Sequence, residues 1–192
     1  MLGTFIYRGV YMKKVVFDLD DTLWALNKRA CEMANVDYNK INAFKLTENK
    51  LLTDEEKSRM LKVYNSIDLW KNIKWEDGVT ELMSLEQFGA KVYINSNCLN
   101  QEIANFKRSF LHKELGIPDD QIILNIITDV KVKPLDNDMY IFIDDSPYNI
   151  SNSKAKYNII PNKPWNKSVE GYRCNTLKEI IELCKSLLNE ES

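Results

Sequence analysis

Short apolar runs alternate with amphipathic stretches along most of the chain. The apolar runs predict strands at residues 13–19, 91–95, 121–127, 139–143 and 156–160. Apolar positions at helical spacing predict helices at residues 78–89, 100–116 and 176–190, of which the first two end at a glycine. Strands that alternate with helices predict an α/β fold, in which a parallel sheet has helices on both faces.

Residues 25–75 interrupt this alternation, because their pattern is helical throughout. Within them, Thr53 followed by Glu56 has the spacing of a capping box at the start of an amphipathic helix. We therefore expect a small helical cap inserted after the first strand. Residues 1–24 and 76–192 would then form the core domain.

Composition narrows the range of partners. The 192 residues are 44% hydrophobic and 28% charged, with a net charge of −2, which gives no reason to expect a nucleic-acid polymer or a membrane as partner. The N-terminus lacks the features of a signal peptide, so we expect a cytoplasmic protein. Residues 1–11 are either a loose lead-in or a short edge strand, and the sequence leaves both a monomer and a homodimer open.

Cysteine and histidine usage narrows the chemistry. The four cysteines are scattered without metal-site spacing, which is typical of reduced, structural thiols. His112 is the only histidine, and one histidine cannot build a zinc site or a histidine-based triad. Carboxylates, hydroxyls and lysines are left as the reactive groups.

Polar side chains follow four of the predicted strands. They are Asp18, Asp20 and Asp21 after the first strand, Ser96 and Asn97 after the second, Lys131 and Lys133 after the third, and Asp144 and Asp145 after the fourth. In open parallel sheets, ligands bind beyond the carboxyl ends of the strands. We therefore expect these side chains to meet in one site.

The residue types in this set suit phosphoryl transfer. Asp18 with Asp144 or Asp145 can bind Mg²⁺, which takes few protein ligands together with substrate phosphate. An ionised carboxylate is also a nucleophile that can form an aspartyl-phosphate. Asp20 points to the same side as Asp18 in an extended chain and can act as general acid and base. Ser96 and a lysine can hold the phosphoryl oxygens.

The motifs "DLDDT", Ser96, a lysine and "DDSPYN", in this order, resemble those of the haloacid dehalogenase (HAD) superfamily of phosphotransferases. The resemblance covers nearly the whole chain and implies a Rossmann-like three-layer sandwich. It also implies that Asp18 is the nucleophile and Asp20 the general acid and base. Mg²⁺ would be held by Asp18, the backbone carbonyl of Asp20, and Asp145, with Asp144 in support.

Two positions stay open within this resemblance. Lys133 precedes a proline, as in many members, whereas Lys131 is better placed after "TD". Either could be the lysine that binds phosphate. Asn95 or Asn97 could share the phosphate-binding role of Ser96.

Two relatives on the same architecture are disfavoured. True dehalogenases lack the second aspartate, which is present here as Asp20. Receiver domains carry their acid pair early in the chain, whereas here the pair Asp144 and Asp145 comes last.

The C-terminal part resembles the 5′(3′)-deoxyribonucleotidases of cytosolic type C. The resemblance rests on Asp144, Asp145, Pro164, Trp165, Asn166 and Arg173, and on Gly78 within "WEDGVTELMSL". It implies a small phosphorylated substrate, a (deoxy)nucleoside monophosphate. Asp21 and Thr22 replace the Gly-Val common in that family, which leaves another small phosphoester open as the substrate. A phosphotransferase and a non-catalytic regulatory module on the same fold are further alternatives.

Four aromatic residues in or next to the cap allow two interpretations. Trp24, Phe44, Tyr64 and Trp70 either line a nucleoside pocket or pack the cap against the core.

Overall fold

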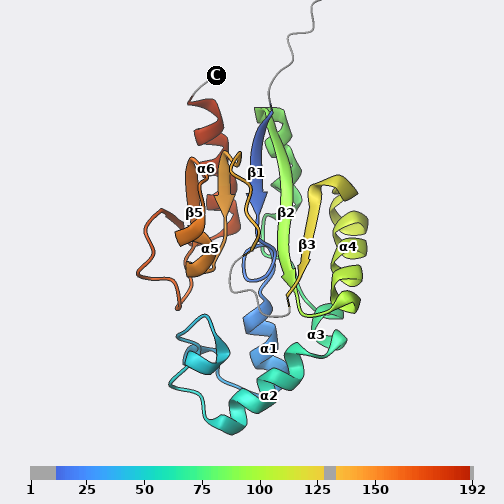
Figure 1. Ribbon diagram of the computed structural model, residues 1–192, viewed down its shortest axis with the longest axis vertical. Coiled ribbons are helices and arrows are strands. Elements are labelled where there is room, and N and C mark those ends of the chain that lie inside the picture. Colours follow the sequence, from blue (N-terminus) through green and yellow to red (C-terminus); the bar gives the residue numbers. More distant parts are fainter. Residues whose placement is uncertain (1–11, 128–132, 191–192) are drawn as a thin grey trace, which may run out of the picture.

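The computed structural model describes residues 12–127 and 133–190, so residues 1–11 and Lys131 lie outside the described residues (Figure 1). The strands are β1 Lys13–Phe17, β2 Ala90–Cys98, β3 Ile122–Ile126, β4 Ile141–Ile143, β5 Tyr157–Pro161 and β6 Tyr172–Cys174. They form one sheet in the order β3-β2-β1-β4-β5-β6, and every neighbouring pair is parallel. The predicted α/β fold with a parallel sheet is confirmed.

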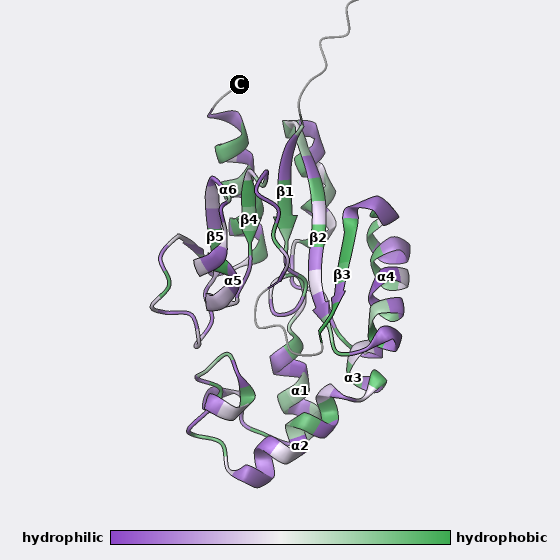
Figure 2. Cartoon of the chain, viewed as in Figure 1, coloured by the Kyte–Doolittle hydropathy of each residue, from purple (hydrophilic) through white to green (hydrophobic). Residues whose placement is uncertain are grey.

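The sheet is covered on both faces. Along β1, Val15 and Phe17 belong to the larger apolar core, whereas Val16 belongs to a second, smaller core. Successive side chains of a strand point to opposite faces of the sheet. Because side chains of β1 are buried on both faces, the sheet is the middle layer of a three-layer sandwich. Hydrophobic residues dominate β3 and β4, while α4 alternates between hydrophilic and hydrophobic positions (Figure 2).

The helices follow their sequence signals. Their bounds are α1 Leu26–Ala34, α2 Asp54–Tyr64, α3 Ile67–Lys71, α4 Gln101–Leu115, α5 Pro147–Asn152 and α6 Leu177–Asn189. Short 3₁₀ segments are η1 Tyr38–Lys40, η2 Leu46–Glu48 and η4 Asp119–Gln121. The capping box of α2 is present, because the Thr53 hydroxyl accepts from the Glu56 amide and the Glu56 carboxylate accepts from the Thr53 amide. No helix in the described ranges is long and apolar enough to span a membrane.

Several details differ from the sequence-based expectation, and one of them is the helix α5, which was not predicted. The predicted helix at 78–89 is a 3₁₀ helix, η3 Val79–Phe88, although Gly89 closes it as expected in a left-handed conformation. The short strand β6 was not predicted. Two of its three residues are exposed, so it carries no apolar run that sequence patterns could detect.

The segment between β1 and η3 lies beyond the carboxyl ends of the strands. Figure 1 shows α1 and α2 below the sheet, on the side to which β1 and β2 point. This arrangement places the helical segment over the strand ends from which the candidate site residues emerge.

Candidate active site

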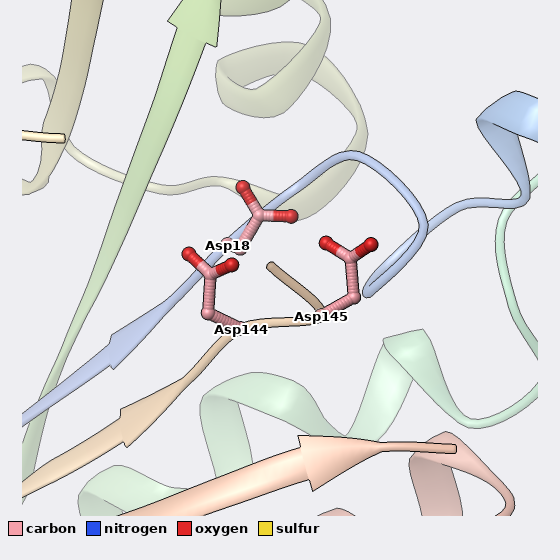
Figure 3. Close-up of side chains that lie close together, drawn as sticks. All are labelled: Asp18, Asp144 and Asp145. Carbon is pink, nitrogen blue, oxygen red and sulfur yellow. The ribbon is translucent and has the colours of Figure 1, made fainter. Parts of the chain in front are cut away.

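Three buried carboxylates meet at the ends of two neighbouring strands. Asp18 directly follows β1, and Asp144 and Asp145 directly follow β4. Each offers one oxygen to a group whose members lie within 4.8 Å of one another, and Figure 3 shows the three side chains around one space. The parallel pairing of β1 with β4 explains this, because it brings both carboxyl ends to the same edge.

One lysine partly compensates the three acids. The Lys133 ammonium donates to Asp18 Oδ1 and, at 2.8 Å, to Asp144 Oδ2. Burial by itself would lower the pKa of Lys133, but Asp144 and Asp18 outweigh it and raise the pKa above its ordinary value. Of the two lysines left open by the sequence, the structure places Lys133 in the site.

The second carboxylate oxygen of Asp18, Oδ2, is the one that Lys133 does not contact. Asp18 is only 4% exposed, and its Oδ2 is buried without a hydrogen-bond partner among the described residues. Burial raises the pKa of Asp18 to about 7, with Lys133 opposing and Asp144 and Asp20 reinforcing the shift. A buried acceptor without a donor costs about 1–3 kcal/mol, and a divalent cation would remove both this cost and the repulsion among the acids. The site therefore fits Mg²⁺.

The two acids after β4 have different surroundings. Asp144 accepts from the Ser146 amide, the Asn149 side-chain amide and Lys133, so protein donors engage both of its oxygens. Asp145 Oδ2 accepts from Trp165 Nε1 at 2.8 Å. Burial, reinforced by Asp18, raises the pKa of Asp145 well above its ordinary value. Asp145 is thus the more available ligand, and Asp144 is placed to support the site.

Asp20 makes its hydrogen bonds to residues outside the group of three clustered acids. Its Oδ1 accepts from Trp24 Nε1 at 2.8 Å, and its Oδ2 accepts from the Lys107 ammonium at 2.7 Å. The sequence interpretation missed Lys107. Its signal was present, because Lys107 lies four residues after Ile103 and four before Leu111, on the buried face of α4.

The three polar residues at the end of β2 have different surroundings. Ser96 is fully buried and accepts from Lys107 at 3.0 Å. Asn97 lines the same cavity as the acids, and its Oδ1 is buried without a hydrogen-bond partner among the residues that the structure describes. Asn95 donates to the Pro134 carbonyl and accepts from Asn125, which anchors the chain next to Lys133.

The third acid of the first motif has a structural position. Asp21 adopts a left-handed conformation, with φ of 59°, and its carboxylate accepts from the Asn27 amide in the first turn of α1. Burial raises the pKa of Asp21 to about 7, with Lys163 opposing the shift. An acid at a helix N-terminus satisfies an otherwise unpaired amide. Asp21 therefore connects the reactive loop to the first cap helix.

A cavity of about 220 Å³ joins the acids to the cap. Its lining includes Asp18, Asp20, Asp145, Lys133 and Asn97 from the core side. The cap side contributes apolar Leu26, Ile41, Phe44 and Leu46 together with polar Asn27, Asn49 and Tyr64. The site is thus charged at the strand ends and mainly apolar under the cap.

Of the four aromatic residues in or next to the cap, two line the cavity and two pack in the core. Phe44 and Tyr64 line the cavity. Trp24 and Trp70 are instead buried in an aromatic cluster, in which Trp24 lies 6.2 Å from Trp70 and stacks on Trp75 at 5.4 Å, measured between ring centroids.

Solved structures with the same fold carry hydrolase descriptions. A HAD hydrolase of family IA, variant 3, from Entamoeba histolytica is 18% identical, with a TM-score of 0.57 over 93% of this chain and 100% of that one. A predicted phosphatase from Clostridium acetobutylicum is also 18% identical, with a TM-score of 0.57 over 90% and 97%. A Bacillus subtilis protein described as a HAD hydrolase bound to magnesium is 16% identical, with a TM-score of 0.56 over 90% and 98%. At these identities the likeness establishes the fold.

Sequence comparison establishes the family. No curated protein matches the chain. Residues 12–188, however, match the family described as "5′ nucleotidase, deoxy (Pyrimidine), cytosolic type C protein". This match spans the sheet, the cap and every described site residue. The chain therefore belongs to the cytosolic type C 5′-nucleotidase family.

Proposed function

We propose that this protein is a Mg²⁺-dependent 5′(3′)-deoxyribonucleotidase, which removes phosphate from (deoxy)nucleoside monophosphates through an aspartyl-phosphate at Asp18. The observation that carries the proposal is the set of three buried acids with Lys133 beneath a partly apolar cavity. The family match supports the nucleotide substrate. The family's cytosolic designation and the four free, buried cysteines support a cytoplasmic location.

Asp18 is the nucleophile in this proposal. One of its carboxylate oxygens attacks phosphorus, and the bond from phosphorus to the sugar oxygen breaks. Lys133 holds Oδ1, and no protein donor among the described residues contacts Oδ2, so the carboxylate stays oriented while one oxygen remains open to a ligand.

Asp20 moves the protons. It gives a proton to the departing alkoxide in the first step, and in the second step it takes one from the water that attacks the aspartyl-phosphate. Its side chain is 24% exposed and lines the cavity, so substrate and water can reach it. The second step releases phosphate and regenerates Asp18.

Lys133, Ser96 and Asn97 are the proposed phosphate-binding residues. The Lys133 ammonium already lies against the nucleophile, where it can also contact a phosphoryl oxygen. Asn97 lines the cavity. Such preset donors stabilise the charge that develops in phosphoryl transfer.

Asp18, Asp145 and the backbone carbonyl of Asp20 are the proposed ligands of Mg²⁺, with Asp144 in support. When bound, Mg²⁺ supplies positive charge that neutralises the phosphoryl oxygens during transfer. The fit rests on the short spacing of the acids and on the unpartnered Asp18 oxygen.

We assign residues 25–75 to a cap and residues 1–24 and 76–192 to the core. The cap would recognise the nucleoside, because Phe44 offers an aromatic face to the cavity while Asn27 and Tyr64 offer polar groups. A pocket that is mainly apolar with a few placed polar groups is typical of small-molecule sites.

Phosphate release from a panel of monoesters, measured with Mg²⁺ and with EDTA, tests the proposal. The panel holds deoxy- and ribonucleoside 5′- and 3′-monophosphates, sugar phosphates and an aryl phosphate. We expect Mg²⁺-dependent release with a preference for deoxynucleotides. Release from sugar or aryl phosphates alone would overturn the nucleotide substrate, and release that persists in EDTA would overturn the metal requirement.

A further inference from the structure

Lys107 is a lysine without any exposed surface. It lies on α4, and both the residue and its side chain are 0% exposed. Its ammonium donates to Asp20 Oδ2 at 2.7 Å, to Ser96 Oγ at 3.0 Å and to the Asn97 carbonyl at 2.9 Å. An ammonium has three donors, so these contacts use all of them. A buried charge is costly unless it is paired and hydrogen-bonded, and Lys107 meets both conditions.

Tryptophans complete the surroundings of this lysine. The Lys107 ammonium lies 4.5 Å from the centroid of the Trp70 ring and 6.0 Å from that of Trp24, within the range of cation–π attraction. Trp24 also donates from Nε1 to Asp20 Oδ1. The two oxygens of Asp20 therefore accept from two different residues, Trp24 and Lys107. Both donors lie outside the group formed by the three clustered acids and Lys133.

We propose that Lys107 and Trp24 are positioning residues for proton transfer, which fix the carboxyl group of Asp20 toward the leaving group. The proposal rests on the role proposed for Asp20. Without these two donors, a side chain that is 24% exposed could rotate toward water in the cavity. Proton transfer needs the acid within hydrogen-bond reach of the leaving oxygen, so a displaced carboxyl group loses rate even when the fold is intact.

The same ammonium also sets the direction of the Ser96 hydroxyl. Because Lys107 donates to Ser96 Oγ, the Ser96 proton must point to another acceptor. The Asn97 carbonyl, at 3.4 Å, is a long contact for this proton. Lys107 thus connects the first motif, through Asp20, with the second motif, through Ser96.

The leaving group distinguishes a positioning role from a purely structural one. A nucleoside alkoxide needs a proton as it departs, whereas a nitrophenolate departs without one. The ratio of kcat/KM for a deoxynucleoside 5′-monophosphate to kcat/KM for p-nitrophenyl phosphate therefore reports proton donation. Because kcat/KM covers steps up to the first phosphoryl transfer, the later hydrolysis of the phospho-enzyme does not mask the effect.

The test uses Lys107→Met and Trp24→Phe, with Lys113→Met as the matched control. Methionine keeps the length and apolar stem of the lysine, and phenylalanine keeps an aromatic ring but removes the Nε1 donor. Lys113 lies on the same helix with its side chain 79% exposed. Thermal unfolding identifies any variant that does not fold, and the Trp24 variant keeps the test decisive if Lys107→Met fails to fold.

We expect the ratio to fall about tenfold or more in both variants, since general acid catalysis contributes roughly 10²–10⁴-fold, and to stay at the wild-type value in Lys113→Met. A folded variant that loses both activities in equal proportion would overturn the positioning role. This failure is distinct from failure of the proposed function, in which the wild-type protein itself would release no phosphate from the nucleotide.

Discussion

Replacing Lys133 with methionine tests the electrostatic balance of the site. Lys133 is 5% exposed and contacts two acids that are themselves at most 4% exposed. Removing one partner from a buried ion pair costs about 3–5 kcal/mol, because the remaining charges stay buried. Since a protein of this size loses roughly 2–4 °C for each kcal/mol, we expect the melting temperature without Mg²⁺ to fall by about 6–20 °C.

Mg²⁺ should reverse part of this loss. The variant keeps three acids within 4.8 Å and lacks the lysine that competes for them, so Mg²⁺ should stabilise it more than it stabilises the wild-type protein. Ligand at about 100 times its Kd stabilises the folded state by about 2.7 kcal/mol. A change of this size exceeds the uncertainty of a urea unfolding measurement.

The assay is urea unfolding in EDTA and over a series of Mg²⁺ concentrations. Lys178→Met is the matched control, because Lys178 forms an exposed pair with Asp77, and such pairs contribute about 0–1 kcal/mol. A free energy of unfolding that changes as little in Lys133→Met as in this control would refute the electrostatic reasoning. Equal stabilisation of variant and wild type by Mg²⁺ would refute the idea that Lys133 and Mg²⁺ compete for the same acids.

Three further predictions concern turnover and metal binding. Asp20→Asn should lower kcat/KM for a nucleoside monophosphate by about 10²–10⁴-fold but affect an aryl phosphate far less; equal losses in a phosphate-release assay would exclude proton transfer by Asp20. Trp165→Phe removes the donor that lies 2.8 Å from Asp145 and should weaken Mg²⁺ binding by about 10–100-fold. Calorimetry measures this affinity, and an unchanged value would contradict the prediction. EDTA should abolish phosphate release and added Mg²⁺ should restore it, whereas activity that survives chelation would contradict the metal site.

Much of the site could be predicted from the sequence because strand ends carry its chemistry. A buried apolar run followed at once by acids, as in "VVFDLDD" and "IFIDD", fixes both the strand and the residues at its end. Parallel pairing then brings Asp18, Asp144 and Asp145 together without any information on side-chain geometry.

Other residues could not be assigned in this way. Lys131 and Lys133 are two residues apart in the sequence, and the local pattern does not determine which of them belongs to the site. Lys107 was missed because lysines on amphipathic helices normally lie in solvent, although its place between Ile103 and Leu111 marks the buried face of α4. The aromatic residues Phe44 and Trp70 look alike in sequence, and only the packing of the cap separates the cavity wall from the core.

The central claim is that Asp18 carries the phosphoryl group. Mass spectrometry of the peptide that contains residue 18, after rapid acid quenching of enzyme mixed with Mg²⁺ and a deoxynucleoside monophosphate, tests it most directly. We expect a phosphorylated Asp18 in the wild-type protein, and neither phosphorylation nor turnover in a folded Asp18→Asn variant. Turnover in that variant, or a phosphoryl group on any other residue, would contradict Asp18 as the nucleophile.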